Sequence, residues 1–340
     1  MSPRRAAPRR AAARTAAAVL AVPALLAGCA QLPPVPAVPA DPAPAAPVVA
    51  PVQAERVVGD VVRAVREAGD DPEALAGRVT GPELALRRAA ARVRGAGAEP
   101  PPTGSADELT PLSSSLPRQE DWPRWFLVVT EPGADSAPSV VVLRSESPRE
   151  PYRVWATPSL LPGTSLPTTE APALGVAVVG PDEDANLLAS PREVAQRYAD
   201  VLTDGDAAPA AADFAEDAYR EQVTRSVAEQ TEALRAGGGT FSQSRELLDG
   251  ADDRPLVALR TRDGGALVVA GYRWETTATG PEGGLLGDLD PVTAALAGRE
   301  QARSARLVRE EVVVLDVPPT DGGVVSVLAV QSGLTEVEAG

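Results

Sequence analysis

The sequence predicts an α+β fold made of two tandem units, each with helices followed by antiparallel strands. Apolar residues recur with the helical period of 3.6 between residues 57 and 68. Valine- and leucine-rich runs of strand length follow, the first over 125–130. The same order of helices and strands recurs after residue 189. Runs of helices followed by runs of strands favour α+β over an alternating α/β fold.

The first unit is expected over 54–160. Its opening helix carries one apolar stripe, formed by Val57, Val58, Val61, Val62, Val65 and Ala68. Pro72 is expected to begin a second helix, which Gly81 and Pro82 interrupt and which then resumes through Val93. Strands are expected over 125–130, 139–144 and 152–157.

The second unit is expected over 189–340, after a connector over 161–188. Ser190 and Glu193 form a capping box with Pro191 at the first helical position, so a helix should start there. A second helix is expected over 210–235, and a third over 291–303 that crosses the sheet. Strands are expected over 241–248, 256–261, 266–277, 306–317 and 324–331.

The N-terminal residues have the pattern of an export signal. Arginines precede an apolar run over 16–27, and small residues lead to the sole cysteine, Cys29. The run is too short for a membrane-spanning helix. A twin-arginine signal at Arg9 and Arg10 is the alternative to ordinary secretion. Residues 1–28 are therefore expected to be a signal peptide, and the proline- and alanine-rich stretch over 29–53 an extended tether.

These features resemble a known class of proteins. The segment Leu26 to Cys29 resembles the signal of bacterial lipoproteins, in which the cysteine receives a diacylglyceryl group and cleavage falls between Gly28 and Cys29. With the connector over 161–167 and the helix start at Ser190, the chain resembles uncharacterised secreted lipoproteins of high-GC Gram-positive bacteria. Each unit resembles the cone-like α+β domain of the nuclear-transport-factor-like, or SnoaL-like, proteins. The resemblance implies a membrane-lipid anchor at the extracytoplasmic face of the membrane and implies no activity.

Composition excludes several kinds of chemistry. The chain has no histidine and no lysine, and its only cysteine is the expected lipid attachment site. Histidine-dependent triads, lysine Schiff bases and thiol or imidazole metal sites are therefore excluded. The net charge of −15 opposes binding to nucleic acid. We expect no cofactor and no enzymatic activity, and only carboxylate, tyrosine and hydroxyl chemistry remains.

One cluster of scarce aromatic residues is a candidate partner-binding patch. Trp122 and Trp125 flank Arg124, and tryptophan and arginine are enriched where proteins bind one another. The alternative is a strand start whose rings close the end of a small core.

A second candidate is a calcium loop. Asp182, Asp184, Asn186 and Glu193 have the spacing of oxygen ligands in an EF-hand. Leu187, however, takes the place of the required glycine, and Glu193 already belongs to the capping box. The alternative, which we favour, is an acidic linker that ends in a helix cap, with no metal.

The expected function is therefore that of a lipid-anchored, non-catalytic binding or scaffolding module that contacts another envelope protein. The alternative is a small-molecule pocket protein, either an apolar-ligand carrier or a hydrolase or isomerase that depends on carboxylates. A cavity of a few hundred cubic ångströms lined by valine and leucine would favour this alternative.

Overall fold

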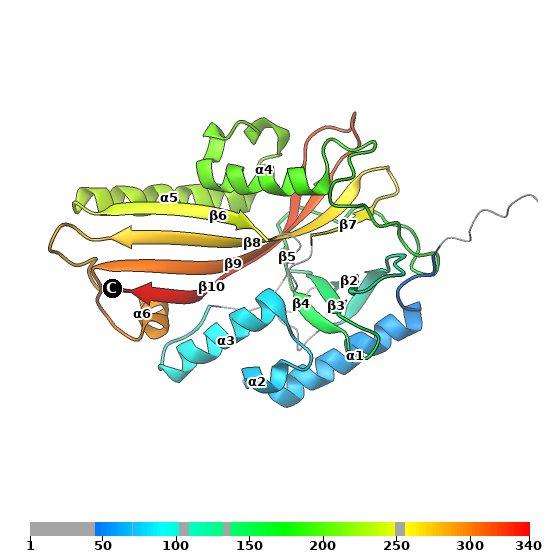
Figure 1. Ribbon diagram of the computed structural model, residues 1–340, viewed down its shortest axis with the longest axis horizontal. Helices are drawn as coiled ribbons and strands as arrows, with labels where there is room; N and C mark the ends of the chain where they lie inside the picture. Colours follow the sequence, from blue (N-terminus) through cyan, green and yellow to red (C-terminus); the bar gives the residue numbers. More distant parts are fainter. Residues whose placement is uncertain (1–44, 70, 102–108, 132–136, 249–255) are drawn as a thin grey trace, which may run out of the picture. The chain divides into compact units, whose positions relative to one another are not determined.

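The computed structural model describes residues 45–340 apart from 70, 102–108, 132–136 and 249–255. Residues Pro44–Gly340 form one compact unit (Figure 1). Helices and antiparallel strands are both abundant in it, which confirms the α+β class.

The first part of the described chain follows the predicted order of helices and then strands. Its elements are α1 (Pro51–Ala68), α2 (Pro72–Leu75), α3 (Gly81–Gly95), β1 (Pro111–Ser115), β2 (Arg124–Thr130), β3 (Val140–Ser145), β4 (Arg153–Ala156) and β5 (Ser159–Leu160). The predicted stripe of α1 points into the core, where Val58, Val61 and Val65 are buried.

The second part of the chain repeats that order. Its elements are α4 (Pro191–Asp204), the short 3₁₀ turns η1 (Gly205–Ala207) and η2 (Ala211–Asp213), α5 (Ala218–Ala236), β6 (Thr240–Leu247), β7 (Val257–Arg260), β8 (Ala266–Thr279), α6 (Pro291–Ala297), β9 (Ser304–Val317) and β10 (Ser326–Ala339). The predicted start of α4 is confirmed, because the Ser190 side chain accepts a hydrogen bond from the Glu193 backbone N–H.

The strands form two antiparallel sheets. The first sheet has four strands in the order β1-β2-β3-β4. The second has six, in the order β5-β10-β9-β8-β6, with β7 paired to β8. Strand β5 follows directly after β4 but joins the second sheet, where Leu160 pairs with Ala329 and Ser159 with Val330. The chain therefore changes sheets at the position where the sequence predicted the end of a domain.

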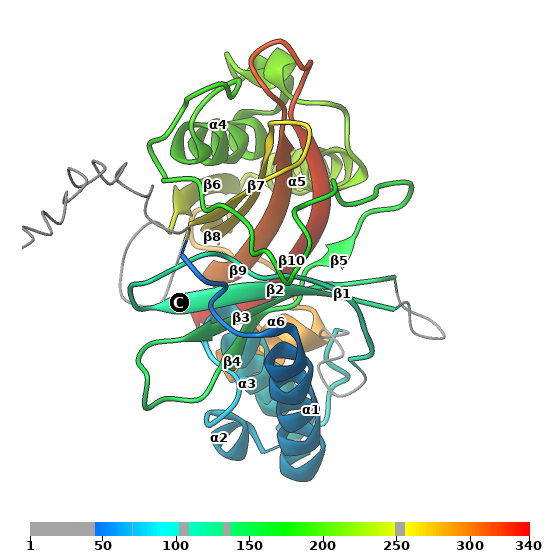
Figure 2. The same ribbon diagram turned by 90° about the vertical axis from the view of Figure 1, so that its right-hand side faces the viewer.

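The layers stack as helices, sheet, sheet and helices (Figure 2). Helices α1 and α2 cover one face of the first sheet through a core that includes Phe126 and Leu143. The other face of that sheet packs on the second sheet through Leu127, Val142 and Val314. Helix α4 covers the remaining face of the second sheet. Both faces of each sheet are thus buried over much of its area.

Trp155 of β4 fills the space between the sheets. Its side chain is fully buried, and its ring lies against Gly271 of β8 and Gly81 at the start of α3. A Cβ atom on Gly81 would lie 2.5 Å from the indole ring, and that residue also has a positive φ of 56°. The tryptophan therefore requires glycine at this position.

A buried polar network joins α3, the end of β4 and β10. The fully buried Glu83 accepts hydrogen bonds from the Thr157 hydroxyl at 2.7 Å, the Gln331 amide at 2.7 Å and Arg87 at 2.8 Å. Gln331 in turn accepts a hydrogen bond from the Thr157 backbone N–H at 2.8 Å. The Glu83 carboxylate thus has partners at both oxygens, as a buried charge requires.

The division into two tandem cone-like units is not confirmed. The predicted boundary over 161–188 lies inside one compact body whose central core takes side chains from both parts. The predicted tether also ends too late, because α1 already begins at Pro51 and Val48 is buried. Two further differences are local, since α5 begins at Ala218 rather than 210 and the sequence did not predict β1 or β5.

We expect the described body to unfold in a single cooperative transition. Alanine at Glu83 should shift this entire transition to lower temperature and lower urea concentration. The substitution leaves Gln331 and Arg87 without their buried acceptor, so the free energy of unfolding should fall by about 3–5 kcal/mol. Calorimetry and urea denaturation measure both effects.

The matched control is Glu73→Ala. The Glu73 side chain is 74% exposed and pairs with Arg88 on the surface, so its loss should cost less than about 1 kcal/mol. Two separate transitions, of which Glu83→Ala moves only one, would contradict the shared core.

Candidate functional site

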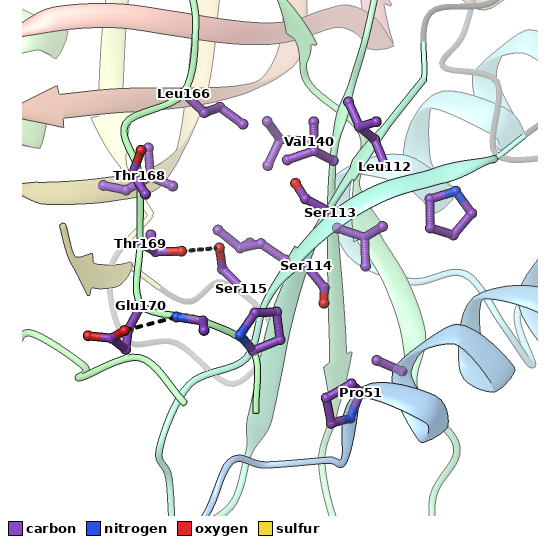
Figure 3. Close-up of a pocket in the computed structure, with 18 of the residues that line it drawn as sticks. Pro51, Leu112, Ser113, Ser114, Ser115, Val140, Leu166, Thr168, Thr169 and Glu170 are labelled. Carbon is purple, nitrogen blue, oxygen red and sulfur yellow. Dashed lines mark hydrogen bonds between the residues drawn. The ribbon is translucent and has the colours of Figure 1, made fainter. Parts of the chain in front are cut away.

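A groove of about 580 Å³ lies along β1, between the first turns of α1 and the segment 166–172 (Figure 3). We call it the β1 groove. Its volume lies within the usual range for small-ligand sites. It is lined by Pro51, Ala54, Glu55, Val58, Pro111–Ser115, Leu127–Val129, Val140, Leu166–Pro172 and Leu267.

The groove has an apolar floor. Leu127 of β2, Val140 of β3 and Leu267 of β8 line it, and all three belong to the core between the two sheets. Leu166 packs against the same core from the segment 166–172. The groove therefore gives a ligand access to the edge of the sheet-on-sheet core.

The rim of the groove carries hydroxyl groups. Ser113, Ser114 and Ser115 stand on β1; the Ser115 hydroxyl points to Thr169, and the Ser114 hydroxyl points away from it (Figure 3). The Ser115 and Thr169 hydroxyls are 2.9 Å apart and form a hydrogen bond across the rim. These groups can donate to or accept from a polar ligand.

In the described part of the chain, no carboxylate is hydrogen-bonded to the hydroxyls of the groove. An activated serine needs an adjacent general base, but the partner of Ser115 is another hydroxyl. The Glu170 carboxylate accepts a hydrogen bond from the Ala171 backbone N–H at 3.2 Å, directed away from the serines (Figure 3). The arrangement is suited to binding.

The sequence alone did not point to the β1 groove. Serine is not among the β-branched and aromatic residues that favour strands, so 111–115 has no local strand signal. The segment becomes a strand because Ser113 and Ser115 pair with Val129 and Leu127 of β2. Nothing in the local pattern indicates that 166–172 lies opposite it.

The predicted aromatic patch does not form as one surface. Trp125 is only 5% exposed and packs between the sheets, so it cannot contact a partner. The Arg124 guanidinium lies 4.9 Å from the centre of the partly exposed Trp122 ring and donates to the Glu120 carbonyl at 2.7 Å. The alternative, a strand start that closes a core, describes Trp125 correctly.

Two of the predicted calcium ligands, Asp182 and Glu193, are paired with arginines. Asp182 pairs with Arg192 at 2.7 Å, which lowers the pKa of its carboxyl. Glu193 pairs with Arg197 at 2.6 Å. The Asn186 backbone, at a positive φ of 61°, bonds through its carbonyl to Thr320, and the Asp184 carbonyl accepts from Leu187 within a turn. In the described part of the chain, no three acidic or other ligand side chains are grouped to hold a metal.

The predicted lipid attachment site, Cys29, and the adjoining Gly28 lie outside the described residues. Among the helices that the structure describes, none is long and apolar enough to cross a bilayer.

A second polar cluster ties α5 to the second sheet. Arg245 of β6 and Glu311 of β9 are both fully buried, and their charged groups lie 2.9 Å apart. The Tyr219 hydroxyl of α5 donates to Glu311, and burial raises the pKa of this tyrosine well above its usual value. Arg245 and Arg309 both lie close to the ring of Trp274, at 4.2 and 4.6 Å. The cluster therefore acts mainly as a structural tie.

The fold and the groove define the class, an α+β protein with a surface groove that an apolar floor and a hydroxyl rim line. The chain belongs to the family described as domain of unknown function DUF8094, whose model matches residues 45–339. It is also 29% identical over 230 residues to a protein of Streptomyces avermitilis called "Uncharacterized lipoprotein". That match covers 64% of this chain and 63% of the relative. No solved structure matches the chain. The resemblance to uncharacterised lipoproteins of high-GC Gram-positive bacteria is thereby confirmed.

One prediction concerns Asp217, which lines a second hollow at the start of α5. Burial raises the pKa of its carboxyl although the carboxylate caps the helix through the Arg220 backbone N–H. The protonated form is therefore favoured by folding, and the free energy of unfolding falls as the pH rises through this raised pKa. Asparagine can still cap the helix, so Asp217→Asn should gain stability relative to wild type as the pH rises from about 4 to 7.

Urea denaturation at several pH values measures this difference. A pH-independent difference between wild type and Asp217→Asn would refute the assignment.

Proposed function

We propose that this protein is an envelope lipoprotein, anchored through acylated Cys29 at the extracytoplasmic face of the membrane, and that its folded body binds a ligand in the β1 groove. The groove is the observation that carries the proposal. It combines an apolar floor of Leu127, Val140 and Leu267 with a hydroxyl rim, and it has the volume of a ligand site.

A non-catalytic role fits the composition of the chain. The chain has no histidine or lysine, and among the described residues no general base is hydrogen-bonded to the serines of the groove. Among the residues that the structure describes, Glu55 and Glu170 are the ionisable ones that line the groove. Affinity in such a site comes from burial of apolar ligand surface, and the rim hydroxyls orient the ligand.

A carrier of a small apolar molecule is the second candidate. The floor favours it, because the side chains that line it are apolar and belong to the core between the two sheets. Both candidates place the ligand in the same groove.

The anchor is tested with Cys29→Ser. The variant cannot be acylated through a thiol, so most of the protein should move from the membrane to the soluble fraction. Fractionation of cells followed by immunoblotting measures the distribution, and mass spectrometry of the wild-type N-terminal peptide measures the lipid. Retention of unlipidated Cys29→Ser in the membrane would rule out the proposed anchor.

The groove is tested with a neutral fluorescent probe, N-phenyl-1-naphthylamine. The wild-type protein should increase its fluorescence, and Ser113→Trp, which places an indole at the rim, should reduce binding about tenfold or more by steric exclusion.

Ser242→Trp is the matched control for this test. Ser242 is an exposed serine on β6, at the edge of the other sheet, and its replacement should leave probe binding unchanged. Equal binding by wild type and Ser113→Trp would show that the groove is not the site.

A further inference from the structure

We propose that the ligand of the β1 groove is an extended polypeptide segment with alternating basic and apolar side chains, which adds to the free edge of β1 as a further strand. This inference rests on the proposed function of the groove and names the class of its ligand. Three features of the groove carry it: the backbone of β1, the two walls and the charge of the lining.

The backbone of Ser114 faces into the groove. The Glu131 N–H donates to the Thr110 carbonyl, and the Thr130 N–H donates to the Ser139 carbonyl on the side of β3. The backbone N–H and C=O groups of odd-numbered residues in β2 therefore point toward β1. Ser113 and Ser115 are paired with odd-numbered residues of β2, so their own backbone N–H and C=O groups point toward β2. Ser114 alternates with them, so its N–H and C=O point outward.

The residues that follow β1 confirm this direction. The Leu116 carbonyl accepts from Val176 and the Arg118 N–H donates to Val176, both at 2.8 Å on the outer side. Ser114 lies two residues before Leu116, so its backbone groups point to the same outer side. Among the described residues β1 is the terminal strand of its sheet, and no backbone is paired with Ser114 there. An unpaired strand edge is a template for another extended chain.

The walls of the groove stand on opposite faces of β1. Pro51, Ala54 and Val58 of α1 form one wall, and Leu166 with Thr168 forms the other. Figure 3 shows Ser115 directed to the segment 166–172, away from Pro51. An added strand sends alternate side chains to opposite faces, so each wall would receive every second side chain.

The charge of the lining selects the partner. Within the described lining, both ionisable residues are carboxylates, Glu55 on the wall of α1 and Glu170 on the opposite wall, although the chain contains many arginines. A segment with basic side chains complements both walls. A second copy of this chain is opposed, because each copy carries a net charge of −15 and would bring further carboxylates together.

Synthetic peptides test the inference on the wild-type protein. The probe is a capped, fluorescently labelled octapeptide of alternating arginine and valine, with binding measured by anisotropy. Two analogues are compared with the parent peptide. One is N-methylated at the valines and the other at the arginines, so each loses the backbone N–H donors along one edge of the extended peptide. One of the two should bind about tenfold or more weakly than the parent, because strand addition uses one edge of the peptide. The octapeptide of alternating glutamate and valine should bind worst.

Two variants of Ser114 test the edge from the protein side. Ser114→Pro removes the outward N–H and leaves the ladder of Ser113 and Ser115 with β2 intact, so peptide affinity should fall about tenfold or more. Ser114→Ala keeps the N–H and removes only one rim hydroxyl, so its affinity should stay well above that of Ser114→Pro. Unfolding midpoints establish that both variants are folded. If Ser114→Pro does not fold, the N-methylated peptides decide the question on the wild-type protein.

The outcomes separate this inference from the proposed function. Equal affinity for both N-methylated peptides and the parent, or for Ser114→Pro and Ser114→Ala, overturns strand addition. A probe that binds in the groove while the basic peptide does not overturns the ligand class and leaves the groove as a binding site. If neither binds, both proposals fail. A dimer in sedimentation that Ser114→Pro dissociates would assign the edge to a second copy and overturn the inference.

Discussion

The packing of one sheet on the other is the constraint on which the rest of this structure depends. Trp155 occupies the centre of that contact and requires glycine at position 81 on one side, with Gly271 on the other. The first sheet has no solvated face over most of its area, because α1 and α2 cover its other side. Separation of the two halves would expose this core to water, at a cost that no single local interaction could offset.

The same contact produces the groove. Its floor takes Leu127 and Val140 from the first sheet and Leu267 from the second, so neither sheet alone could form it. Strand β1 lies at the edge of the first sheet, where the helix α1 and the segment 166–172 diverge around it. A binding site at the margin of a shared core is thus a direct consequence of the stacking.

Charge is distributed differently in the interior and at the groove. Inside, Glu83 and Glu311 are matched by arginine, tyrosine or amide donors, so the buried charges serve to hold helices to strands. At the groove Glu55 and Glu170 face no arginine of the lining. The acidic groove and the outward-facing backbone of Ser114 are the recognition elements of the proposed strand addition.

The sequence by itself determined the secondary structure and the chemistry that is excluded. The periodicity of Val58, Val61 and Val65 and the cap at Ser190 are local signals, so α1 and α4 could be predicted, as could most strands. Only the tertiary structure decided that the continuous apolar runs of β2 and β3 are buried on both faces, that Trp125 is core, and that β1 forms a groove. The reason is physical. The second buried face of β2 and β3 packs on residues of β8 and β9 that are more than a hundred positions away, and β1 becomes a strand only through its pairing with β2, so a local pattern contains no record of either.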